Sequence, residues 1–271
     1  MKHRHALVLT AIILPVCALL RIIQIYFTIE GTTGFIKQQY KTISVLITVI
    51  ICAATAALGL LAATLEGMRK NDYKQRPFFA IVCALTGGMF FYQTVAGATQ
   101  ITNGTWYNLL LALLSLMSAF VFVVYGFKNI YDFELPALLY VIPVSYYIVK
   151  LISIFVSTSE LARVTENVFL IFTNGILLWF MFEFASLEGE VGNLAKKPKR
   201  LFASGLSASV LCCVVSLPKL IVVPMKKITL TSGDISESLL ALSMGIFILT
   251  YIICNFVNNN KESKSLGRHS V

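Results

Sequence analysis

Eight long apolar segments follow one another along this 271-residue chain, and they constrain its fold more than any other feature. A segment of about 20 apolar residues is long enough to cross the hydrocarbon core of a bilayer as an α-helix. Only 13% of the residues are charged, which is about half of the proportion in a typical soluble domain. We therefore predict an all-α, polytopic integral membrane protein with eight transmembrane helices. The approximate limits of the segments are 6–28, 42–65, 78–100, 106–127, 137–157, 167–187, 201–223 and 237–257.

The distribution of Lys and Arg predicts the orientation of these helices. If the N terminus is cytoplasmic, fourteen basic residues fall in cytoplasmic segments and five fall in outer segments. Cytoplasmic loops of membrane proteins carry such an excess of basic residues. We therefore expect both termini in the cytoplasm and a location in the plasma membrane. The same loops account for the net charge of +9, so we expect the lipid bilayer, and no nucleic acid, as the partner.

The first segment has an alternative interpretation. It begins MKHRHALVLTAIILPVC, and a basic start before an apolar run is also typical of a secretory signal peptide. However, Val16 precedes Cys17 where a lipoprotein signal carries a small residue, and no good small-residue cleavage site follows. We favour a first helix that is retained in the membrane.

Two parts of the sequence resemble each other, which predicts an internal duplication. Leu-Glu-Gly followed by a basic loop occurs at Glu66 and again at Glu188, and Pro15 in the first segment corresponds to Pro143 in the fifth. Two four-helix halves in the same orientation are a known arrangement in transporters. Chance similarity between apolar segments is the alternative. The predicted halves are residues 1–128 and residues 129–271, the second with a short cytoplasmic tail.

Polar residues recur on one face of several predicted helices. Residues three, four or seven positions apart share a helix face, so Arg21 lines up with Gln24, and Lys150 lines up with Ser153. The third and seventh segments add further amide, hydroxyl and ammonium groups. If these faces meet, they form one polar cavity among the first, third, fifth and seventh helices. The candidate ligand-binding residues are Arg21, Gln24, Gln93, Lys150, Ser153, Ser216 and Lys219.

Three of these candidates are cations in the outer half of the predicted membrane, and we expect no acidic residue beside them. A charge at the bilayer centre costs at least about 2.5–3.5 kcal/mol. In one interpretation, each long side chain extends to the outer lipid headgroups. In the other, Arg21, Lys150 and Lys219 face a shared cavity that suits a small anion or a lipid headgroup.

Acidic residues are few in the predicted spans. Glu183 lies near the cytoplasmic end of the sixth segment, where it either reaches the cytoplasmic water or couples ligand movement to protons. Glu66 and Glu188 are each followed by glycine, which is typical of a turn that ends a helix.

No catalytic or metal-binding motif stands out. The chain has no HExxH, GxSxG or Walker A sequence, its three histidines lie at the termini, and its six cysteines lack ligand spacing. We therefore expect no catalytic residue, no metal and no cofactor, and we lean against an enzyme. Transport of a small anionic or headgroup-like ligand, in the manner of a permease, is the leading interpretation. A membrane sensor, or a subunit of a larger complex with a partner we cannot name, is the alternative, and a lipid-modifying enzyme is third.

Overall fold

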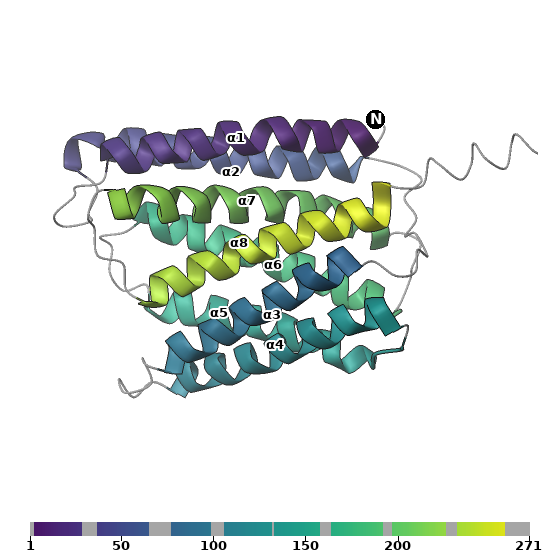
Figure 1. Cartoon of the computed structure of the whole chain (residues 1–271). Coiled ribbons are helices and arrows are strands. Elements are labelled where there is room, and N and C mark those ends of the chain that lie inside the picture. The colour runs from purple at the N-terminus through teal and green to yellow at the C-terminus, as the bar shows by residue number, and fades with distance from the viewer. Residues whose placement is uncertain are drawn as a thin grey trace, which may run out of the picture.

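The apolar segments form helices that lie side by side in one bundle (Figure 1). A computed structural model describes residues 3–28, 37–64, 77–98, 106–131, 133–157, 164–191, 197–225 and 232–257. Within these ranges, eight helices are long and apolar enough to cross a membrane, as the sequence predicts. Their bounds are α1 His3–Thr28, α2 Lys41–Ala63, α3 Pro77–Ala98, α4 Trp106–Tyr131, α5 Val141–Ser157, α6 Val164–Glu188, α7 Lys197–Met225 and α8 Ser232–Ile252.

Short irregular turns adjoin three of the helices. The 3-10 turns η1, Gln38–Tyr40, and η3, Ala137–Tyr140, lead into α2 and α5, and the π-helical turn η5, Ile253–Val257, continues α8. The predicted limits differ most for α8, which begins at Ser232 rather than at residue 237. Helix caps and polar first turns carry little apolar signal, so hydropathy alone places such a start too late.

Helix α7 lies at the centre of the bundle. It packs against α1 and α2 on one side and against α6 and α8 on the other. Figure 1 shows α1 and α2 as one edge of the bundle and α3, α4 and α5 as the opposite edge. Long apolar side chains such as Leu60 and Phe120 are exposed on the periphery, as expected of residues that face lipid. The chain is therefore a multi-pass integral membrane protein.

Small residues permit the closest helix contacts. A Cβ atom built on Gly87 in α3 would lie 2.9 Å from the backbone oxygen of Ala119 in α4. A Cβ atom on Gly59 in α2 would clash with Oγ of Ser207 in α7. Small residues commonly allow transmembrane helices to approach in this way.

The two predicted halves contact each other through several helix pairs. Helix α7 packs against α1 and α2, and α8 packs against α3. The proposed duplication stays a prediction, and Glu66, one of the residues on which it depends, lies outside the described residues.

We name the two ends of the bundle from the predicted orientation. The end that contains the C terminus of α1 and the N terminus of α8 is called the predicted outer end, and the opposite end is the predicted inner end.

Candidate functional site

The guanidinium of Arg21 is buried within the bundle instead of facing lipid. Its residue is 3% exposed, and Nη1 donates a hydrogen bond to Oε1 of Gln24, one turn later, at 2.6 Å. The Cζ atom of Arg21 lies 4.2 Å from the centre of the Phe169 ring in α6. A guanidinium remains charged in proteins and stacks well on aromatic rings. The chain therefore holds a fixed positive charge between α1 and α6.

Arg21 lines a small cavity near the predicted outer end. The cavity has a volume of about 40 Å³, several times the space of about 10–15 Å³ that one water molecule requires. Helices α1, α5, α6, α7 and α8 contribute to its lining. Its polar lining residues are Arg21, Tyr146, Tyr147, Lys150, Thr173, Asn174, Ser216, Lys219, Glu237 and Ser238. We call this space the outer cavity.

The prediction that the cations have no acidic neighbour is wrong. Nζ of Lys150 in α5 lies 3.1 Å from Oε1 of Glu237 in α8. The error follows from the late predicted start of this helix, which placed Glu237 at a membrane boundary. Because α8 begins at Ser232, Glu237 lies inside the helix and its side chain reaches the outer cavity. The cavity therefore carries charges of both signs.

Two buried hydroxyl groups in the outer cavity lack a protein partner. Within the described part of the chain, neither Oη of Tyr147 nor Oγ1 of Thr173 makes a hydrogen bond. Tyr147 is 1% exposed and Thr173 is 5% exposed. Buried polar groups are almost always hydrogen-bonded, and leaving one unsatisfied costs about 1–3 kcal/mol. These hydroxyls are therefore available to a polar molecule in the cavity.

A second cavity lies on the other side of α5. It has a volume of about 220 Å³ and is formed by α3, α4 and α5. Tyr146 and Lys150 line both cavities, so their side chains form part of the partition between them. The polar residues that line the second cavity are Gln93, Tyr107, Asn108, Tyr146, Lys150 and Ser153.

The structure divides the predicted ligand-binding residues into three groups. Arg21, Lys150, Ser216 and Lys219 line the outer cavity, whereas Gln93 and Ser153 line the second cavity. The first, third, fifth and seventh helices therefore do not share one cavity, contrary to the expectation from the sequence. Helix α3 faces the second cavity, and α6 and α8 contribute to the outer cavity in its place.

Gln24 forms the third group, because its amide joins α1 to α2. Nε2 of Gln24 donates to the backbone oxygen of Ser44 at 2.6 Å, to Oγ of Ser44 at 2.9 Å and to Oγ1 of Thr48 at 2.9 Å. Its other amide atom, Oε1, accepts the hydrogen bond from Arg21. Gln24 therefore positions Arg21 and fixes it relative to α2.

Ser216 contributes less to the cavity than its position suggests. Its hydroxyl donates a hydrogen bond to the backbone oxygen of Cys212 in the same helix.

Glu183, the candidate for proton coupling, lies far along α6 toward the predicted inner end. Its residue is 5% exposed, and Oε1 lies 4.0 Å from Nη1 of Arg200 at the start of α7. Its role in coupling stays a prediction.

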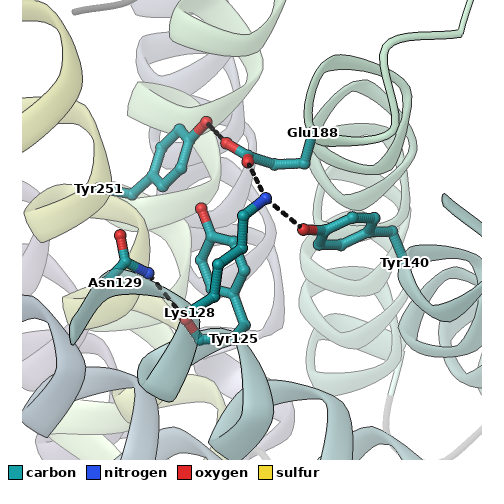
Figure 2. Close-up of polar contacts among 6 residues, drawn as sticks. All are labelled: Tyr125, Lys128, Asn129, Tyr140, Glu188 and Tyr251. Atoms are coloured by element: carbon teal, nitrogen blue, oxygen red, sulfur yellow. Dashed lines mark hydrogen bonds and ion pairs between the residues drawn. The ribbon is translucent and has the colours of Figure 1, made fainter. Parts of the chain in front are cut away.

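Glu188 belongs to a polar cluster at the predicted inner end (Figure 2). Its side chain is 3% exposed, Oε1 accepts a hydrogen bond from Oη of Tyr251 at 2.7 Å, and Oε2 lies 3.8 Å from Nζ of Lys128. Lys128 also donates to Oη of Tyr140 at 3.0 Å. Four elements, α4, η3, α6 and α8, meet in this inner cluster. Helix α6 ends at Glu188, as the following glycine predicts.

Sequence reasoning missed Glu237, Tyr147, Thr173 and Phe169. The sequence contains a signal for Glu237, because it lies three positions after Asp234. The two acidic residues therefore share a helix face that continues into the apolar segment. Phe169 and Thr173 lie one turn apart on α6, but an aromatic residue and a threonine are common in any transmembrane helix. Helical periodicity alone does not show which face of α6 meets Arg21.

Comparisons with known proteins do not identify a relative of this chain. No protein-family model, no curated protein and no solved structure matches the chain. The functional argument therefore rests on the outer cavity, its buried Arg21 and its neighbouring charges.

Proposed function

We propose that the protein binds a small oxyanion, free or as part of a lipid headgroup, in the outer cavity, and that it moves this ligand across the membrane as a transporter does. The observation that carries the proposal is the burial of Arg21 in the lining of a polar cavity. A guanidinium presents a planar fork of donors that matches a carboxylate or phosphate.

The contacts of Arg21 favour this function over a role as a membrane anchor. A cation that extends to lipid headgroups keeps its charged end in the interfacial water. Arg21 is instead held between Gln24 of its own helix and the Phe169 ring of α6. Such fixed positioning is what an anion site requires, because the donors are then preorganised before the ligand arrives.

Thermal stabilisation of the purified protein by phosphate, sulfate and propionate tests the binding site, because a bound ligand raises stability by mass action. We expect Arg21→Gln to lower the apparent affinity about tenfold or more, which corresponds to the loss of about 1.4 kcal/mol or more. Arg21→Lys keeps the charge but loses the fork of donors, so we expect an intermediate affinity. Lys41→Gln is the control, since it removes an exposed cation at the same end of the bundle.

Two outcomes would contradict the proposal. If none of the three anions stabilises the wild-type protein, the outer cavity is no anion site. If Arg21→Leu responds to anions as the wild type does, Arg21 has no part in binding. Uptake of a stabilising anion into proteoliposomes then tests transport, and binding without uptake would favour the sensor or subunit.

A further inference from the structure

The outer cavity is lined by charges of both signs, which come from different helices. Positive side chains come from Arg21 on α1 and Lys219 on α7, whereas the carboxylate of Glu237 comes from α8. Lys150 on α5 also lines the cavity, with its ammonium 3.1 Å from Glu237. The cavity thus offers cationic groups that can pair with an oxyanion and a carboxylate that can pair with an ammonium group.

We infer that the ligand of the outer cavity is a small zwitterion, in which an oxyanion and a primary ammonium group are a few atoms apart. This inference rests on the proposed function, because it assigns the oxyanion to Arg21. The carboxylate of Glu237 receives the ammonium group. The shared chemistry fits either a free amino acid or amino phosphate, or the headgroup of an aminophospholipid.

Glu237 retains capacity for a second partner beside Lys150. A carboxylate has two oxygens with about four lone-pair sites, and an ammonium group occupies one or two of them. The side chain of Glu237 is 30% exposed, whereas that of Lys150 is 16% exposed. Oε1 of Glu237, the oxygen that faces Lys150, is itself buried and makes no hydrogen bond within the described residues, so it can accept one from a ligand.

A site for a simple anion would not gain from this carboxylate. A negative charge in the lining of a cavity repels a negative ligand and lowers its affinity. An ammonium group on the ligand reverses the sign of this interaction. The same arrangement then separates zwitterions from anions of the same size, which is specificity by repulsion of the wrong ligand.

The hydroxyl groups and the volume of the outer cavity suit the binding of a small polar molecule. Oη of Tyr147 and Oγ1 of Thr173 have no hydrogen-bond partner within the described residues, and both groups line this cavity. The volume of about 40 Å³ leaves room for one molecule of a few heavy atoms. A long or branched ligand would require the surrounding helices to move.

The first arm of the test compares matched ligands on the wild-type protein. Each pair differs only by the ammonium-bearing group: β-alanine against propionate, and phosphoethanolamine against inorganic phosphate. We expect the zwitterion of at least one pair to bind about tenfold more tightly, as measured by thermal stabilisation and confirmed by calorimetry. Equal or tighter binding of the simple anion in both pairs overturns the inference and leaves the proposed anion site intact. If no compound binds, both the inference and the proposed function fail.

The second arm tests whether Glu237 causes the preference for a zwitterion over a simple anion. Glu237→Gln removes the acidic partner, so we expect zwitterion affinity to fall about tenfold while affinity for the simple anion stays equal or rises. Glu134→Gln is the matched control, since it removes an exposed carboxylate outside the cavity lining. If Glu237→Gln does not fold, Lys150→Met combined with Glu237→Gln replaces it, because this variant leaves no buried charge without a partner. Unchanged zwitterion selectivity in a folded Glu237 variant overturns the inference.

A third arm separates the two sources of the zwitterion. The protein is placed in nanodiscs of phosphatidylglycerol, with or without phosphatidylethanolamine. If the headgroup is the ligand, phosphatidylethanolamine abolishes the stabilisation by soluble phosphoethanolamine, because it already occupies the site. If the ligand is a free molecule, the soluble compound stabilises the protein equally in both lipids. Either result supports a zwitterion site, whereas lack of stabilisation by the soluble compound in both lipids overturns it for amino phosphates.

Discussion

The ammonium of Lys150 lies 3.1 Å from the carboxylate of Glu237 and joins α5 to α8 at the predicted outer end. Lys150 also lines both cavities, so this ion pair holds part of the partition between them. A charged pair that lines a cavity serves two purposes. It offsets the cost of placing each charge inside the bundle, and it sets the electrostatic character of the space beside it.

Breaking this pair on one side should destabilise the protein more than removing both charges. The side chains are only partly exposed, so we expect Glu237→Gln or Lys150→Met alone to lower the free energy of unfolding by about 1–3 kcal/mol, between the values for surface and fully buried pairs. The double variant Lys150→Met, Glu237→Gln should recover much of this loss. Denaturant titration of all four proteins in one detergent measures the coupling. Additive losses in the double variant would show that the two residues do not interact.

Gln24 should act on the anion site through Arg21. Gln24→Leu removes the acceptor of Nη1 of Arg21 and the three hydrogen bonds to α2. We expect a loss of about 1–3 kcal/mol in stability, because buried donors and acceptors are left unsatisfied, together with weaker stabilisation by phosphate. Gln24→Glu keeps the acceptor for Arg21 but cannot donate to Ser44, and its carboxylate competes with an anion for Arg21, so we expect phosphate binding to weaken further.

Thr28→Val is the control for Gln24. Oγ1 of Thr28 donates to the backbone oxygen of Gln24 in its own helix, at 2.6 Å. Its loss should change neither stability nor phosphate binding by much. If Gln24→Leu binds phosphate as the wild type does, Gln24 does not position Arg21 for binding.

The apolar segments predict the helices well, because about 20 apolar residues in a row have few alternatives to a transmembrane helix. The sequence also places Arg21 and Lys150 at similar depth, and both line the outer cavity. Periodicity shows which residues share a face of one helix, but it leaves open which neighbour that face meets. For this reason Gln93 and Ser153 were expected beside Arg21, whereas they line the second cavity. Glu237 was missed because hydropathy does not detect the polar first turns of α8.

Two adjacent glycines in α3 should respond differently to the same substitution. A Cβ atom at Gly87 would lie 2.9 Å from the backbone oxygen of Ala119 and 2.8 Å from Cγ2 of Val123, so α3 and α4 would have to separate. We expect Gly87→Ala to lower the midpoint of thermal unfolding and to cost about 1–3 kcal/mol, as overpacking does. Gly88 has nothing within 4 Å of a Cβ atom, so Gly88→Ala should be neutral or slightly stabilising. Equal effects at the two positions would contradict the close contact between α3 and α4.

The inner cluster should stabilise the end of the bundle opposite the outer cavity. Lys128→Met removes a cation that lies 3.8 Å from the buried carboxylate of Glu188, and we expect a loss of about 3 kcal/mol in stability. Tyr251→Phe removes one hydrogen bond to that carboxylate and should cost about 1.5–3 kcal/mol, because the acceptor is charged. Neither substitution should alter the affinity for phosphate, since neither residue lines the outer cavity. A large change in phosphate affinity with stability intact would show that the two ends of the bundle are coupled.

The orientation of the bundle can be tested with two exposed positions at opposite ends. Met225 at the end of α7 is 76% exposed and Tyr131 at the end of α4 is 71% exposed, so a cysteine at either position should be equally reactive in detergent. The six native cysteines are first replaced to remove the background. In intact cells, an impermeant thiol reagent should label Met225→Cys, because the excess of basic residues places that end outside. Tyr131→Cys should react only after the cells are opened. The reverse pattern would place the outer cavity, with Arg21 and Glu237, on the cytoplasmic side of the membrane.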